Sequence, residues 1–182
     1  MRRVADWSSS CVACRACARQ RTRRTSFGTP HADQNAADGL KRCRLVAQHK
    51  ALRKEPKWYL RDHAMVEDTG KRTETLIACH LLKAVDYYRD EGFGVFELRY
   101  LRDKDKREVD FLIVRDKKPW VLVEAKHADR DLSPALAYFQ AQVGAPHALQ
   151  VVVDMPYAAA DCFAQHSGPL VVPARTLLSQ LV

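Results

Sequence analysis

Two carboxylates and a lysine stand inside otherwise apolar segments of this 182-residue chain. Alternation along residues 121–126 sends the side chains of Glu124 and Lys126 to the same face of a strand. In the preceding apolar run, residues 109–113, Asp110 is the one acidic residue, and a short hairpin can bring it close to Glu124. A carboxylate buried in a strand is costly unless a cation or hydrogen bonds compensate it. Two such groups close together therefore indicate a divalent metal ion.

Mg²⁺, or Mn²⁺ in its place, prefers oxygen ligands and commonly takes one or two carboxylates, with water and substrate phosphate in the remaining positions. We expect Asp110 and Glu124 to be these ligands. Lys126 can orient or help deprotonate an attacking water and offset charge on the phosphate, which would give metal-assisted phosphodiester hydrolysis. Glu74 is expected to be an accessory carboxylate and metal ligand, because it lies at the start of the apolar face of a helix.

The elements that must position these residues follow from the hydrophobic periodicity. Apolar residues recur at intervals of three or four across residues 71–89, which predicts an amphipathic helix closed by Glu91-Gly92. Three strand-like segments follow, joined by the short polar connections that antiparallel hairpins require. These segments are residues 95–101, 108–114 and 120–126.

A second helix is expected to begin at Ser133-Pro134 and to end before Gly144, because serine followed by proline is typical of a helix start. Residues 147–153 then predict a buried strand, and residues 169–173 and 174–181 a further strand and a closing helix. The core order α-β-β-β-α-β predicts an α/β fold in which helices flank a mixed sheet.

Composition divides the chain into two parts. Residues 1–50 show no sustained period and are predicted to be a poorly ordered, basic, Cys- and Arg-rich leader. Residues 51–182 are predicted to be the folded domain, with its core at 71–154 and an extended segment at 57–62 leading into it. Residues 1–54 hold 13 Lys and Arg against 3 Asp and Glu, a net charge of +10, whereas the remainder holds 17 against 19, a net charge of −2. The net charge of +8 therefore does not class the folded domain as a nucleic-acid binder.

Three classes of protein are disfavoured by the same reading. No apolar run approaches the roughly 18 residues of a membrane span. The N-terminus lacks the continuous apolar stretch of a secretory signal, so we expect a cytoplasmic protein. No G-x-x-x-x-G-K-[ST] motif is present, so ATP hydrolysis by this chain is not expected.

The pattern of Asp110, thirteen intervening residues and Glu124-x-Lys126, with a helical glutamate upstream, resembles the PD-(D/E)XK nuclease superfamily. More closely, several segments resemble the uncharacterised C-terminal domain of a bacterial and archaeal AAA-type ATPase family. These segments are Glu74 to Lys83, Phe96 to Asp103, Arg107 to Phe111 and Val123 to Lys126.

This resemblance spans about residues 51–154. It implies a restriction-endonuclease-like fold, DNA or RNA as the substrate and, because the motor domain is missing, a separate ATPase subunit as a partner. The chain departs from the family at Thr73 and Thr75, where an aromatic residue and Asn are usual, and in its first 50 residues. We therefore expect a truncated or rearranged copy with an unrelated leader.

Other readings stay open at this point. Asp110, Glu124 and Lys126 can form a structural ion-pair cluster, and the domain can be a non-catalytic module that docks a protein or a nucleic acid. An enzyme needs its carboxylates and Lys126 to converge in an open cleft, whereas Lys126 paired with Glu124 across a filled core would contradict catalysis. The oligomeric state is not predicted by the sequence.

Two weaker patterns have ordinary alternatives. Cys11-x-x-Cys14-x-x-Cys17 has the spacing of many zinc and iron–sulfur sites, but no further cysteine follows at a suitable interval, which favours reduced thiols. Tyr138 and Gln140 lie on the helix after the Glu-x-Lys strand, where the resemblance to some related nucleases implies a Gln or Tyr directed toward the substrate, although periodicity favours packing.

Overall fold

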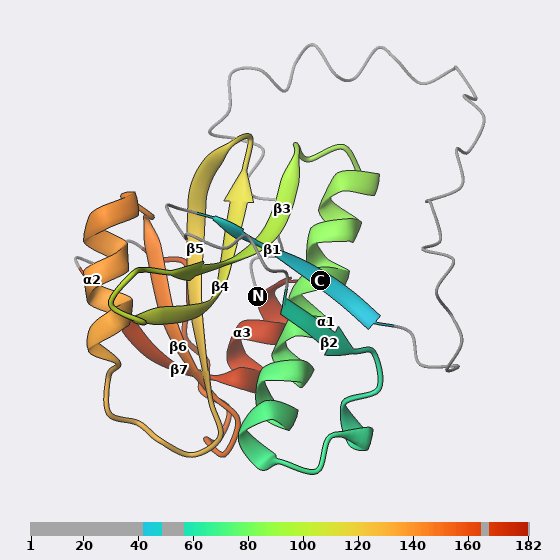
Figure 1. Ribbon diagram of the computed structural model, residues 1–182, viewed down its shortest axis with the longest axis vertical. Coiled ribbons are helices and arrows are strands. Elements are labelled where there is room, and N and C mark those ends of the chain that lie inside the picture. The colour runs from blue at the N-terminus through green and yellow to red at the C-terminus, as the bar shows by residue number, and fades with distance from the viewer. Residues whose placement is uncertain (1–41, 49–56, 165–167, 182) are drawn as a thin grey trace. The chain divides into compact units, whose positions relative to one another are not determined.

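A mixed sheet with helices on both faces is formed by residues 42–48, 57–164 and 168–181, the parts of the chain that the computed structural model describes (Figure 1). Its elements are β1 (Arg42–Gln48), β2 (Lys57–Leu60), η4 (His63–Met65), α1 (Thr69–Asp90), β3 (Phe96–Arg102), β4 (Glu108–Arg115), β5 (Lys118–Lys126), α2 (Pro134–Val143), β6 (His147–Val152), β7 (Leu170–Pro173) and α3 (Ala174–Leu181).

The described strands lie side by side in the order β2-β1-β3-β4-β5-β6-β7. β3, β4 and β5 form an antiparallel meander, and β2 is antiparallel to β1. Parallel pairing joins β1 to β3, β5 to β6, and β6 to β7. The predicted α/β class with a mixed sheet is therefore confirmed.

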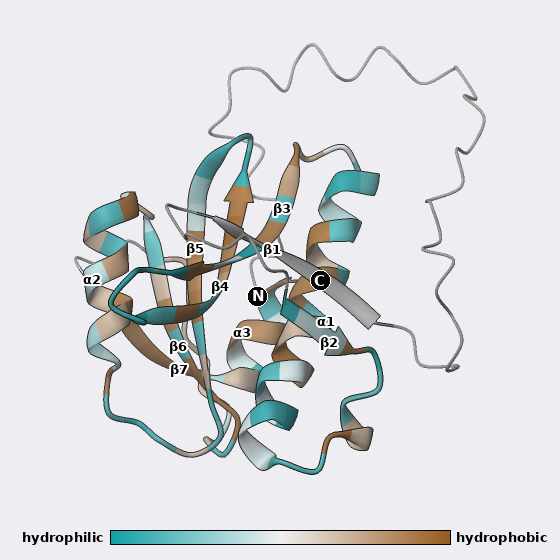
Figure 2. Ribbon diagram, in the orientation of Figure 1, coloured by the Kyte–Doolittle hydropathy of each residue, from teal (hydrophilic) through white to brown (hydrophobic). Residues whose placement is uncertain are grey.

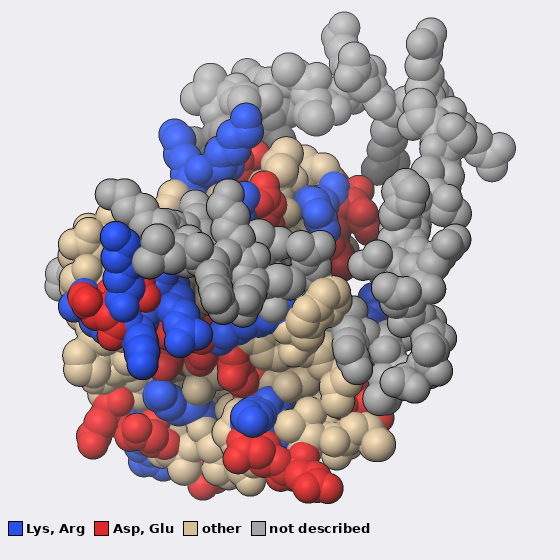
Figure 3. Space-filling model, in the orientation of Figure 1, with Lys and Arg blue, Asp and Glu red and all other residues tan. Residues whose placement is uncertain are grey.

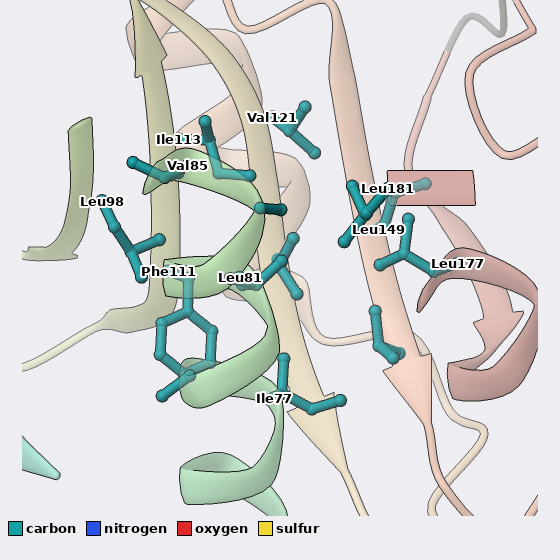
Figure 4. Packing of buried hydrophobic residues seen from close by; sticks show 14 of the residues in the cluster. Ile77, Leu81, Val85, Leu98, Phe111, Ile113, Val121, Leu149, Leu177 and Leu181 are labelled. Atoms are coloured by element: carbon teal, nitrogen blue, oxygen red, sulfur yellow. The ribbon is translucent and has the colours of Figure 1, made fainter. Parts of the chain in front are cut away.

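Helix α1 begins after Asp68, whose side chain accepts a hydrogen bond from the backbone N–H of Lys71 at 2.7 Å. This cap satisfies one of the N–H groups that a helix start leaves without a partner. Ile77, Leu81 and Val85 lie on one face of the helix and are buried against the sheet (Figure 4). The predicted helix and its apolar face are thus confirmed.

The sheet buries one apolar layer on each face, and the two layers hold the strands in place. On one face, α1 and α3 pack on side chains that include Phe111, Ile113 and Leu149. On the other, α2 packs through Leu136 and Phe139. Burying each such side chain contributes roughly 2 kcal/mol. In Figure 2 the hydrophobic colour accordingly follows the strands and parts of the helices that cover them.

A two-residue turn joins β4 to β5. Asp116 and Lys117 have φ angles of 49° and 65°, the left-handed geometry of a type I′ hairpin, and Arg115 pairs with Lys118 across the turn. The Asp116 side chain accepts a hydrogen bond from the N–H of Val95 at 2.9 Å, which compensates for the strained backbone. The turn sets the first pairs of the hairpin, and a β-bulge between Ile113 and Val114 then shifts the register by one residue, which places Asp110 opposite Glu124.

The folded unit extends further toward the N-terminus than its predicted start at residue 51, because the compact unit that carries the sheet spans Leu40–Val182. Strand β1 lies in the segment for which no regular structure was predicted. β1 pairs with β3 across about 53 positions of the sequence, Val46 with Arg99, so no local sequence pattern predicts this strand. None of the described helices is long and apolar enough to cross a membrane.

Candidate active site

The meander brings Asp110 and Glu124 together at the end of the sheet where β4 begins and β5 ends. The two strands are in register at Phe111 and Val123, and each carboxylate lies one residue beyond that pair. The Asp110 Oδ2 atom then accepts a hydrogen bond from the N–H of Ala125 at 2.9 Å. The Asp110 carboxylate thus accepts a hydrogen bond from a backbone N–H at the end of the β4–β5 ladder, and this bond fixes the position of the carboxylate.

A β-bulge also shapes the backbone at Asp110. Arg99 pairs with Leu112 and Leu101 with Val109, so that Tyr100 of β3 lies opposite both Asp110 and Phe111 of β4. A bulge breaks the alternation of side chains and turns one of them toward a new direction. Alternation read from the sequence therefore does not hold along β4 at this residue.

Glu124 and Lys126 lie on the same side of β5, as their spacing predicts, and form an ion pair with 3.0 Å between Lys126 Nζ and Glu124 Oε1. Glu124 is 7% exposed, and its Oε2 atom is buried with no hydrogen-bond partner among the described residues. Leaving a buried carboxylate oxygen without a partner is costly, so such an atom calls for an explanation. The Lys126 side chain is 33% exposed, so the pair stands at a solvent-accessible edge and does not span a filled core.

Glu74 reaches the same region from the second turn of α1, but its carboxylate is already engaged. Its Oε1 atom accepts a hydrogen bond from the Tyr59 hydroxyl and lies 3.2 Å from Lys57 Nζ. Lys57 also forms an ion pair with Glu108 at the start of β4. The negative charge of Glu74 therefore acts on Asp110, while the contacts with Tyr59 and Lys57 hold the Glu74 side chain against strand β2.

Lys57, Tyr59 and Glu108 were not predicted as site residues. A local signal existed for two of them: in the extended segment that became β2, alternation sends Lys57 and Tyr59 to one face. No sequence signal linked that face to Glu74, because the contacts cross from β2 to α1.

Burial and like charge act on the acidic residues of the site. Burial, with the negative charges of Glu124 and Glu74, raises the pKa of Asp110 to about 7, against the effects of the Ala125 N–H and of Lys57. Burial opposes the charge on Lys126, but its hydrogen bond to Glu124 and the nearby carboxylates outweigh that effect and raise its pKa. Lys126 is therefore an ammonium group at neutral pH, suited to orienting groups and to stabilising negative charge.

The side chains of the site offer a divalent metal ion two carboxylates. Within the described part of the chain, no three His, Cys, Asp or Glu side chains converge closely enough to enclose a metal ion. Asp110 and Glu124 remain as two neighbouring carboxylates, the number that Mg²⁺ commonly takes from a protein. The unpartnered Oε2 of Glu124 is the specific feature that fits such an ion.

The remaining candidates have structural contacts. The guanidinium of Arg107 lies 3.9 Å from the centre of the Tyr138 ring, and the Gln140 side chain donates to the Ala145 carbonyl at 3.3 Å. Cys11-x-x-Cys14-x-x-Cys17 lies outside the described residues.

Thr73 and Thr75, the two departures from the family pattern, are both buried at the start of α1. Thr75 donates to the Lys71 carbonyl at 2.7 Å, and the Thr73 hydroxyl lies 3.4 Å from Nδ1 of His127, the residue after Lys126. Threonine is thus accommodated at both positions by hydrogen bonding.

A further polar residue, Gln150, lies on the strand next to β5 and holds a loop beside the site. Gln150 of β6 is completely buried and lies beside Glu124 in the parallel register. Its side chain accepts from the N–H of Ser133 at 2.8 Å and donates to the carbonyls of Asp131 and Asp129 at 2.9 and 3.3 Å. It therefore fixes the loop that runs from Lys126 to α2, a role for which a single polar residue in a buried strand is the sequence signal.

The fold and the site together define a mixed α/β domain with a buried carboxylate, a half-buried carboxylate and an adjacent lysine at one end of its sheet. Residues 69–165 match the family described as a domain of unknown function (DUF4143), and the chain belongs to that family. Comparisons with curated proteins and with solved structures found no match.

Proposed function

We propose that this domain is a Mg²⁺- or Mn²⁺-dependent phosphodiesterase of the PD-(D/E)XK type that acts on DNA or RNA. The observation that carries the proposal is the buried, unpartnered Oε2 of Glu124 beside the carboxylate of Asp110. A cation bound between these side chains would give that oxygen its missing partner and would lower the electrostatic cost of two adjacent carboxylates.

The chain's own residues have distinct roles in this proposal. Asp110 and Glu124 would hold the ion, which supplies Lewis-acid activation of the scissile phosphate and offsets its charge. Lys126 would orient the attacking water and stabilise negative charge that develops on the phosphate. Glu74 would act as an accessory carboxylate, with its place fixed by Tyr59 and Lys57.

The arrangement of elements supports a restriction-endonuclease-like fold. Helix α1, the meander β3-β4-β5, helix α2 and strand β6 follow one another in the α-β-β-β-α-β order to which the resemblance points. The carboxylates lie on β4 and β5, as in the resembling superfamily. On this basis we also propose descent from the C-terminal domain of an AAA-type ATPase, with a separate ATPase subunit as a partner.

The proposal is tested by calorimetric titration of Mg²⁺ and Mn²⁺, with cleavage of single- and double-stranded DNA and RNA assayed in parallel. The wild type is compared with Asp110→Ala/Glu124→Ala. Asp90→Ala/Glu91→Ala, two exposed carboxylates at the end of α1, is the matched control. We expect metal-dependent cleavage by the wild type and the control, and neither binding nor cleavage by the site variant. A folded wild type that binds no metal and cuts nothing would refute the proposal.

A non-catalytic docking module is the second candidate, and an exposed apolar surface favours it. Tyr87, Phe93 and Val95, at the junction of α1 and β3, are exposed, the latter two by 48% and 57%. The rings of Tyr87 and Phe93 lie 6.5 Å apart.

Basic and acidic side chains are interspersed on the face seen in Figure 3, so any phosphate-binding surface there would be local. Two results together would support docking: the wild type binds no metal, and the Phe93→Ser substitution abolishes binding to the ATPase subunit.

A further inference from the structure

Strand β2 places a second ammonium group at the carboxylate site. Lys57 Nζ lies 3.2 Å from Glu74 Oε1, forms an ion pair with Glu108 and lies 5.2 Å from the centre of the Tyr100 ring. The Lys57 side chain is 24% exposed, so its charge is mostly withdrawn from water. Carboxylates from two elements, α1 and β4, therefore hold this one cation in a fixed position.

The charges of the site divide into two regions. Lys57 and the Tyr59 hydroxyl both contact the Oε1 atom of Glu74, and Lys57 also neutralises Glu108. The exposed Arg102 contributes little to this region, because its Nε lies 3.6 Å from Glu108 and solvent screens the pair.

The other region holds Asp110 and Glu124. Lys126 forms an ion pair with Glu124, and Lys57 acts on Asp110 only as the last of several electrostatic effects. The Oε2 atom of Glu124 has no partner among the described residues. The negative charge that is least compensated therefore lies on the Asp110 and Glu124 side of the site.

We propose that Lys57 occupies the position that a second metal ion would need, so that the site takes a single divalent cation, held by Asp110 and Glu124. This inference rests on the proposed function and assigns Lys57 as a positioning residue that sets the number of ions. A second ion between Glu74 and Glu108 would have to displace an ammonium that is bonded to both carboxylates. Lys57 thus supplies, from the protein, the charge that a second ion supplies in two-metal sites.

The stoichiometry of Mn²⁺ binding tests this assignment. Full-length wild type, Lys57→Gln, Lys57→Arg and the control Lys83→Gln, an exposed lysine of α1, are titrated with Mn²⁺ and followed by calorimetry and by electron paramagnetic resonance. We expect one bound ion in the wild type, in Lys57→Arg and in Lys83→Gln, and two in Lys57→Gln. The second ion should be lost again in Lys57→Gln/Glu108→Gln.

The possible failures can be told apart. Two ions in the wild type, or a folded Lys57→Gln that still binds only one, would overturn the role of Lys57 and leave the proposed function standing. A wild type that binds no ion would remove the proposed function. In that case an ion gained by Lys57→Gln would still support Lys57 as the blocking charge, and none gained would overturn it. If Lys57→Gln does not fold, Lys57→Met is titrated in its place, and a folded Lys57→Met that binds no more ions than the wild type would overturn the role of Lys57.

Discussion

Asp110 and Glu124 are kept in a position that is unfavourable for an ionised pair. Burial and mutual repulsion raise the pKa of Asp110 to about 7, and one oxygen of Glu124 has no partner in the described structure. Side chains selected for stability alone would avoid both features. Their combination at one end of a sheet is the physical reason for which a catalytic site is proposed here.

The raised pKa of Asp110 makes stability depend on pH. Because the folded-state pKa lies above the usual value of 3.8, the protonated form is favoured by folding. The associated stability is complete below pH 3.8 and is lost as the pH rises through about 7. Asp110→Asn, which is always neutral, should therefore be more stable than the wild type at pH 8.5, by up to about 4 kcal/mol. The difference should shrink at pH 5.5.

Urea unfolding at the two pH values, without divalent metal, measures this difference. Asp90→Asn, an exposed carboxylate on the same chain, is the control and should leave the pH dependence unchanged. Parallel stability curves for Asp110→Asn and the wild type would show that Asp110 ionises without cost in the folded state.

The site residues that the sequence revealed are those whose signal is local. Asp110 and Glu124 stand out because a charge interrupts an apolar run, and Glu124 and Lys126 share a face by simple alternation. Lys57 and Glu108 could not be predicted as site residues, because their contacts join β2 to α1 and β4. The bulge at Asp110 also lay beyond prediction, since it appears only in the register of β4 against β3.

At the scale of elements, helices and hairpins were predictable and strand β1 was not. The helices end where capping residues indicate: Gly144 follows α2 with a φ of 67°, as its left-handed conformation requires. Ser133 precedes α2 without a side-chain capping bond, and its backbone N–H donates to the Gln150 side chain. Strand β1 depends on pairing with distant strands, which no local pattern records.

Gln150 is the clearest case of one side chain holding an element in place. Replacing it with leucine would leave the N–H of Ser133 and the carbonyl of Asp131 without their partners. We expect Gln150→Leu to lower the free energy of unfolding by about 3 kcal/mol. Hydrogen exchange should also accelerate selectively in residues 129–133, which join the Glu-x-Lys strand to α2.

Gln140→Leu is the matched control, because Gln140 lies partly exposed on α2 and makes a single bond of 3.3 Å to Ala145. Its loss should cost less than about 1 kcal/mol. Equal losses in the two variants, or unchanged exchange in residues 129–133, would mean that the loop is held by other contacts.

At the scale of the whole molecule, charge is distributed unevenly between the leader and the rest of the chain. Residues 1–54 carry a net charge of +10, and residues 55–182 carry −2. A substrate with a phosphate backbone would therefore be attracted chiefly by the N-terminal segment, while the carboxylate site would carry the chemistry. Binding and catalysis should accordingly respond to different substitutions.

Neutralising the arginines of the first 24 residues tests whether phosphate binding depends on residues other than those of the proposed catalytic site. Each phosphate contact that such a variant loses should reduce the slope of log affinity against log salt by about 0.9 on duplex DNA. Asp110→Ala/Glu124→Ala should keep the wild-type slope. The variant replaces with Gln the residues Arg2, Arg3, Arg15, Arg19, Arg21, Arg23 and Arg24.

Fluorescence anisotropy with a labelled duplex measures the slope of each variant. The salt concentration is varied from about 50 to 200 mM, a range over which counterion release changes the affinity strongly. A smaller slope in the arginine variant alone would assign phosphate binding to the leader. An unchanged slope would mean that these arginines are solvated. Any affinity for nucleic acid would then have to come from local groups of the folded unit, where Lys57 and Lys126 are already engaged by carboxylates.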